Sequence, residues 1–210
     1  MTDHLPAALG GEHPATKRPA ILTPVSRPAA PAAPEPGRWI RTAAACVAVT
    51  AIWALAVFGS TQIKVGHDAR HFAVFLHVVS LTFGFGSVLA LDVCGLAALV
   101  RRRGFTLADA VRTAAIVDPL IWSGYLGLVL SGLLLRPDLH SGPMWVKLGA
   151  ALAAGLNGIN AHGVMTAMSF VPRTTRLADL PRPFAARAVT ATAISQCAWW
   201  TAIVIGFFGA

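Results

Sequence analysis

Five apolar runs, separated by short polar segments, follow one another from residue 40 to residue 208. A helix that crosses the hydrocarbon core of a bilayer needs about 20 consecutive apolar residues, and each run is close to that length. The pattern predicts five membrane-spanning helices, at residues 40–60, 72–100, 113–135, 144–170 and 187–208. We therefore expect an all-α fold, an integral membrane bundle of five transmembrane helices, within residues 38–210.

The first 37 residues differ sharply from the rest of the chain. They are rich in proline and alanine, as in "RPAAPAAPEPG", and contain no aromatic residue. Such a segment buries too little apolar surface to offset the entropy lost on ordering. Residues 1–37 are predicted to form a disordered cytoplasmic tail.

Composition supports a membrane protein, with the lipid bilayer as its main partner. Hydrophobic residues make up 55% of the chain, charged residues only 12%, and the mean hydropathy is +0.63. Soluble domains carry about 25% charged residues. The net charge of +8 does not indicate a nucleic-acid partner, because the basic residues form no patch interleaved with aromatic residues. They stand at the ends of the apolar runs: Arg38, Arg41, Arg101, Arg102, Arg103, Arg112, Arg173, Arg176, Arg182 and Arg187.

The arginines also predict the orientation. Lys and Arg accumulate in cytoplasmic loops, which places the "RRR" segment and the loop after residue 170 inside. The opposite loops hold only Lys64, Arg70 and Arg136. We expect the N-terminus inside and the C-terminus outside, in the inner (cytoplasmic) membrane of a bacterial cell. Cys46, Cys94 and Cys197 lie within apolar runs, and this odd number of buried positions indicates packing residues rather than disulfides.

The run "HVVSLTFGFGSVLALDVCG" carries two ionisable residues, His77 and Asp92. A helix rises about 1.5 Å per residue, so with the span centred near Gly86, His77 lies roughly 13 Å towards the outside and Asp92 roughly 9 Å towards the inside. Both fall on one broad face of the helix. The difference in depth predicts that they belong to two separate sites.

The same estimate places a layer of polar residues in the inner half of the membrane, one from each of four spans. Its members are Asp92, Asp118, His162 and Gln196. Ionisable groups at this depth cost a few kcal/mol each unless they are paired or neutral, so we expect them to meet inside the bundle. Asp92 is predicted to pair with His162 or to share a proton with Asp118.

Two neighbouring stripes complete this layer. Trp122 and Tyr125 follow Asp118 at helical spacing, so the three share one face of their span. Asn157 and Asn160 lie on a different face of the fourth span from His162. They are predicted to hydrogen-bond another neighbour.

The predicted outer half contains four histidines, His67, His71, His77 and His140. His67 and His71 are four residues apart, a spacing that presents two imidazoles together on a helix. One interpretation is a metal site built from His67, His71 and His77, and another is a b-type haem held by His77 and His140. His162 cannot share that haem, because it lies roughly 19 Å from His77 in depth. The alternative is a set of interfacial histidines without a ligand.

Two segments carry a resemblance to a known family. "LHVVSLTFGFGSVLALD" at 76–92 and "MWVKLGAALAAGLNGINAHG" at 144–163 resemble segments of copper-resistance D-type bacterial membrane proteins. The resemblance implies a multi-pass helical fold that handles copper. It carries over to His77, Lys147 and one of Asn157 or Asn160.

Three functions remain open from the sequence. The first is metal or haem handling, for redox chemistry or transport, with copper or b-type haem at an outer-half histidine site. The second is a non-catalytic membrane subunit, in a homo-oligomer or a larger membrane complex, whose polar layer is structural. The third is a proton- or ion-coupled transporter. No phosphate-binding glycine loop or Ser/His/Asp signature occurs in the sequence.

Overall fold

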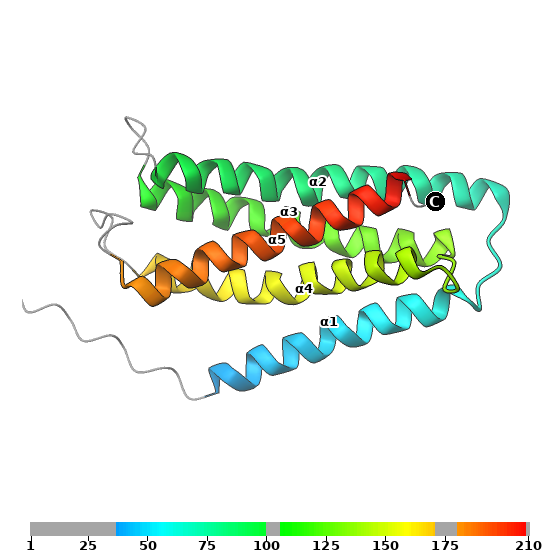
Figure 1. Cartoon of the computed structure of the whole chain (residues 1–210), viewed down its shortest axis with the longest axis horizontal. Helices are drawn as coiled ribbons and strands as arrows, with labels where there is room; N and C mark the ends of the chain where they lie inside the picture. Colours follow the sequence, from blue (N-terminus) through cyan, green and yellow to red (C-terminus); the bar gives the residue numbers. More distant parts are fainter. Residues whose placement is uncertain (1–36, 100–105, 171–179, 209–210) are drawn as a thin grey trace, which may run out of the picture. The chain divides into compact units, whose positions relative to one another are not determined.

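The computed structural model of the protein describes residues 37–99, 106–170 and 180–208. In these ranges the chain forms five helices and no strands (Figure 1): α1 Arg38–Ser60, α2 His67–Leu99, α3 Leu107–Leu135, α4 Gly142–Ser169 and α5 Arg182–Phe208. The prediction of an all-α fold is confirmed. The predicted disordered tail lies outside the described residues except for Gly37, and so do the "RRR" segment and the loop arginines 173 and 176.

Four helices of the described ranges are long and apolar enough to cross a membrane: α1, α2 over His67–Ala97, α3 over Ala108–Leu135, and α5. The chain is therefore a multi-pass membrane protein. α4 is not among the four helices. It matches the predicted fourth span in position but carries Lys147, Asn157, Asn160 and His162.

Local signals set the helix starts. α3 begins with a capping box in which the Thr106 hydroxyl accepts the Asp109 backbone N–H at 3.3 Å and the Asp109 carboxylate accepts the Thr106 N–H at 2.9 Å. The two side chains satisfy backbone donors that a helix N-terminus leaves unpaired. α4 follows Ser141 with a proline in its first turn, where the missing proline N–H costs nothing.

The helices associate as two antiparallel pairs, α2 with α3 and α4 with α5, while α1 contacts α3 and α4. The α2–α3 pair is held by small residues. A Cβ added at Gly124 would fall on the backbone of Gly84 and Ser80, and one added at Gly127 would fall on the Ser80 side chain. The two backbones therefore lie in direct contact, as small residues permit between membrane helices.

Side chains, rather than backbones, join the two pairs. Phe85 of α2 packs against Trp199 and Trp200 of α5, with ring centroids 5.7 and 5.2 Å apart. Phe85, Val88 and Trp199 form a buried cluster. The contact between α2 and α5 is therefore made by aromatic side chains.

Candidate functional site

The end of the bundle that carries residues 61–66 and 136–141 is called here the predicted outer end. Ser131 lies one turn before the end of α3, and its hydroxyl is fully buried. The Nδ1 atom of half-buried His77, from α2, lies 2.8 Å from this hydroxyl. The same hydroxyl oxygen lies 2.6 Å from the Gly127 carbonyl, to which it donates. A serine hydroxyl has one proton to give. When that proton goes to the Gly127 carbonyl, His77 Nδ1 donates to the Ser131 oxygen, and this tautomer leaves Nε2 with its lone pair.

Lys147 of α4 approaches this histidine from the other helix pair. It is half-buried and lies within electrostatic range of His77. Its Nζ lies beside Gly206 of α5, 3.2 Å from the position a Cβ would take there. Among the described residues, no carboxylate forms an ion pair with Lys147. Because Gly206 has no side chain, the Lys147 ammonium group can lie against the α5 backbone at this position.

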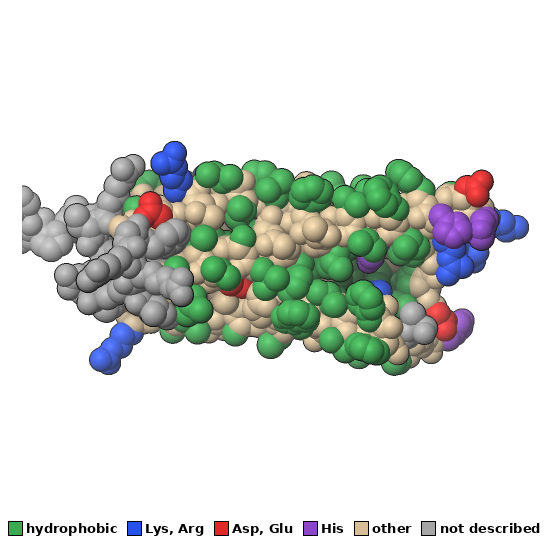
Figure 2. Space-filling view, turned by 90° about the horizontal axis from the view of Figure 1, so that it is seen from above, with side chains coloured by type: hydrophobic (Ala, Val, Ile, Leu, Met, Phe, Trp, Pro, Cys, Tyr) green, Lys and Arg blue, Asp and Glu red, His purple; other side chains and the backbone are tan. Residues whose placement is uncertain are grey.

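The outer half thus contains a Lewis-basic nitrogen and an ammonium group on opposite sides of the gap between the helix pairs. Figure 2 shows a hollow in the apolar surface, towards the end where histidines gather, with a histidine and a basic side chain visible inside it. Such a pair can bind a ligand that has both an electron-pair acceptor and a negative charge.

The structure does not bring His67, His71 and His77 together as a metal site. No group of three His, Cys, Asp or Glu side chains that could hold a metal ion occurs within the described ranges. The exposed rings of His67 and His71 pack edge to face with centroids 4.3 Å apart. The reason lies in the helix rotation: His77 turns towards Ser131 in the interior, while the other two stay at the exposed start of α2.

His140 occupies a different position from His77. Its backbone N–H donates to the Asp138 carboxylate at 3.0 Å, and its exposed side chain lines a cavity at the predicted outer end. A shared haem between these two histidines has no supporting contact.

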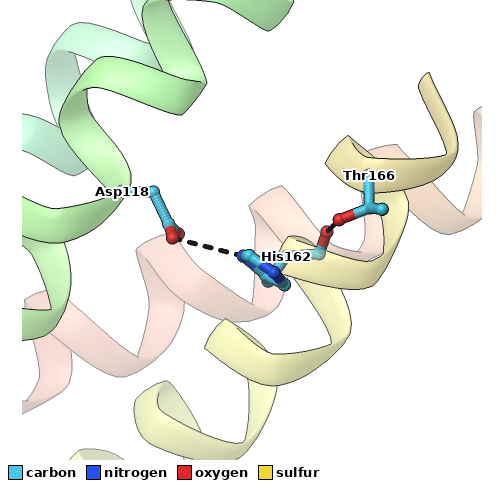
Figure 3. A network of polar contacts seen from close by, with 3 residues as sticks. All are labelled: Asp118, His162 and Thr166. Atoms are coloured by element: carbon cyan, nitrogen blue, oxygen red, sulfur yellow. Dashed lines mark hydrogen bonds and ion pairs between the residues drawn. The ribbon is translucent and has the colours of Figure 1, made fainter. Parts of the chain in front are cut away.

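In the predicted inner half, Asp118 of α3 and His162 of α4 form an ion pair, with Oδ2 and Nδ1 3.2 Å apart. Figure 3 shows the two side chains pointing towards each other across the gap between their helices. They are 35% and 60% exposed, so this pair lies at the edge of the bundle. The Thr166 hydroxyl donates to the His162 backbone carbonyl at 2.9 Å, a contact within α4 that does not involve the His162 ring (Figure 3).

The stripe predicted on α3 is confirmed, because all three residues face α4. Beyond the Asp118–His162 pair, Trp122 lies over Gly158 and Tyr125 lies over Gly155. The Tyr125 hydroxyl is buried and has no hydrogen-bond partner among the described residues. Glycines spaced along α4 thus accept the two aromatic rings.

The predicted partner of Asp92 was wrong. Its carboxylate accepts a hydrogen bond from Gln196 Nε2 at 2.5 Å, and Gln196 Oε1 accepts one from Trp200 Nε1 at 3.0 Å. Asp92 meets neither His162 nor Asp118, because its carboxylate bonds α5 while those two residues bond each other. His77 and Asp92 have partners on different helices, Ser131 of α3 and Gln196 of α5; that they belong to separate sites stays a prediction.

The two asparagines hold α4 against α5. Buried Asn157 donates to the Ala191 carbonyl at 2.7 Å. Asn160 Oδ1 accepts two hydrogen bonds from Arg187, at 2.9 and 2.7 Å. The prediction that they bond a neighbour other than that of His162 is confirmed. The inner layer is therefore a set of separate pairs and not one converging site.

Two residues of the site were not singled out from the sequence. Ser131 is the one hydroxyl in the apolar stretch "LGLVLSGLLL", and a buried polar residue there signals a partner. Gly206 carries no signal in the sequence, because its role is the absence of a side chain opposite Lys147.

Comparison of the chain with models of protein families, with characterised proteins and with solved structures found no match. The resemblance to copper-resistance D-type proteins therefore stays a hypothesis. Of the residues it carries over, His77 and Lys147 lie on one site in the structure, whereas Asn157 and Asn160 bond α5 elsewhere.

Proposed function

We propose that this protein is a five-span protein of the bacterial inner membrane that binds a b-type haem in its outer half, where His77 Nε2 would hold the iron. The hydrogen bond between His77 Nδ1 and Ser131 carries the proposal. Histidines that ligate metals are held in this way, with the second ring nitrogen donating to a fixed acceptor that sets the tautomer.

Haem fits this donor set better than a free copper ion. A bound copper ion needs several soft or imidazole ligands, and here it would face the positive charge of Lys147. In haem the porphyrin nitrogens already bind the iron, so the protein would supply only the remaining ligands. Its propionates are anionic, and Lys147 would pair with one of them. The bound haem would supply one-electron chemistry or be the transported cargo.

The proposal includes α4 as the fifth span. Its 28 residues correspond to about 42 Å of helix, enough to cross a bilayer. Its polar side chains turn to other helices: His162 to Asp118, Asn157 and Asn160 to α5, and Lys147 to Gly206. Polar residues in membrane helices face the bundle in this way. With five spans and the arginine bias, the N-terminus is inside and the C-terminus outside.

A haem titration of the purified protein in detergent tests the proposal. Added haemin should give a sharpened, shifted Soret band at one equivalent, and His77→Ala should abolish it while leaving the helix content unchanged. His140→Ala serves as the matched control and should bind as the original protein does. If haemin binds equally well without His77, or not at all to the original protein, the proposal fails. Copper found by elemental analysis, and lost in His77→Ala, would favour a copper site instead.

A second candidate is a non-catalytic membrane subunit whose polar residues only join helices. The pairing of Asp92 with Gln196, and of Asn160 with Arg187, favours this function, because each contact is satisfied within the chain. It predicts that substitutions in the layer change stability alone. Haem binding that depends on His77 would exclude this candidate for the outer half.

A further inference from the structure

A cavity opens at the predicted outer end, apart from the His77 site. It has a volume of about 440 Å³ and is lined by the C-terminal ends of α1 and α3, the first turn of α2 and the 136–141 connection. This volume is within the range of small-molecule sites, about 300–1,000 Å³. The cavity is therefore large enough for a headgroup or a small metabolite.

Two arginines give the cavity its charge. Arg70 of α2 and Arg136 at the end of α3 both line it, and neither has a carboxylate partner among the described residues. Asp138 is the acidic residue in the lining, and its carboxylate accepts the His140 backbone N–H. The cations exceed the anions by one charge, counting the two arginines and Asp138. Guanidinium groups bind carboxylate and phosphate oxygens with paired, charge-assisted hydrogen bonds.

The backbone that carries Arg136 is held in an unusual conformation. Its φ is +52°, the only positive φ at a non-glycine residue in the part of the chain described. Glycine or asparagine usually occupies this position at the end of a helix; here it is an arginine that precedes Pro137, which disfavours continuation of the helix. The loop beyond it is fastened: Trp145 Nε1 donates to the Leu139 carbonyl at 2.8 Å, and Ser141 N–H donates to the Asp138 carbonyl at 3.2 Å.

Apolar side chains supply the remaining walls. Leu134, Leu135 and Leu139 line the cavity together with Val65. The cavity lies where α1 and α3 end, which is the level of the lipid headgroups for helices that span the hydrocarbon core. Cations at the rim with leucines below suit a ligand that has an anionic head and an apolar body.

We infer that this cavity binds a phosphate ester group, with Arg70 and Arg136 as the two phosphate-binding residues. The phosphate can belong to an anionic phospholipid of the surrounding leaflet or to a soluble phosphate ester. The inference does not depend on haem binding at His77, because the two sites have no lining residue in common.

Native mass spectrometry and calorimetry of the detergent-purified protein test this site, with phosphatidylglycerol, glycerol 3-phosphate and inorganic phosphate as probes. The variant Arg70→Gln/Arg136→Asn removes both charges, and asparagine tolerates the left-handed backbone. Loss of two charge-assisted hydrogen bonds should weaken binding by roughly tenfold or more. Lys64→Gln is the matched control, since it removes a cation at the same end that does not line the cavity.

The probes distinguish the two sources of phosphate. Retention of phosphatidylglycerol alone assigns the site to lipid, and binding of glycerol 3-phosphate assigns it to a soluble ester. The inference is overturned if no probe binds, or if Lys64→Gln weakens binding as much as the double variant, which would indicate diffuse surface charge. Arg70→Gln alone leaves the loop at residue 136 unchanged and should give an intermediate affinity. It shows whether the loss in the double variant comes from the missing charges or from misfolding.

Discussion

Replacing Gly124 with alanine tests whether direct backbone contact between α2 and α3 holds the bundle together. The new Cβ would fall on the backbone of Gly84 and Ser80. Backbone atoms cannot rotate away, so the two helices must separate. Overpacking of this kind costs about 1–3 kcal/mol, and we expect the upper part of that range.

Gly132 provides a matched control on the same helix. A Cβ added there meets nothing within 4 Å. Gly132→Ala should therefore show only the intrinsic helix preference, a gain of about 0.5–1 kcal/mol. The same preference acts at Gly124, so the difference between the two variants isolates the cost of separating the helices.

Thermal unfolding in detergent, followed by circular dichroism, measures this difference. At about 2–4 °C per kcal/mol for a chain of this size, Gly124→Ala should unfold several degrees below Gly132→Ala. Separation should also lengthen the His77–Ser131 hydrogen bond and weaken haem binding. Equal unfolding temperatures for the two alanine variants would refute the close packing of α2 and α3.

Three further predictions concern other contacts. Gln196→Leu should destabilise the protein by about 1–3 kcal/mol, because it leaves the carboxyl of Asp92 without its partner. Adding Asp92→Leu should restore part of the lost stability, which chemical unfolding of both variants measures. Gly206→Leu should displace the Lys147 ammonium and weaken haemin binding in a titration, whereas Gly206→Ala, which meets only the flexible end of that side chain, should bind nearly as the original protein does. A cysteine placed at Gly104 should react with a membrane-impermeant reagent only after the cell is opened; labelling in intact cells would reverse the predicted topology.

The helices themselves could be predicted from the sequence, because the length and polarity of each apolar run depend only on neighbouring residues. The relative level of residues along the bundle could also be predicted, since the helical rise converts residue number into distance. Asp118 and His162 were expected at one level from this argument, and they form an ion pair. The predicted orientation relies on loop charges at residues that the structure does not describe.

Tertiary structure decided which residues of one layer meet. Asp92, Asp118 and His162 were expected at similar depths, yet the Asp92 carboxylate bonds Gln196 of α5, while Asp118 and His162 bond each other. The rise along a helix is a local property, but the rotation of the helix about its axis and the helices it contacts depend on how all five helices pack. The same reason explains the outer site. His77 is visible in the sequence as a histidine in an apolar run, whereas its bond to Ser131 and its approach to Lys147 exist only once the two helix pairs have come together.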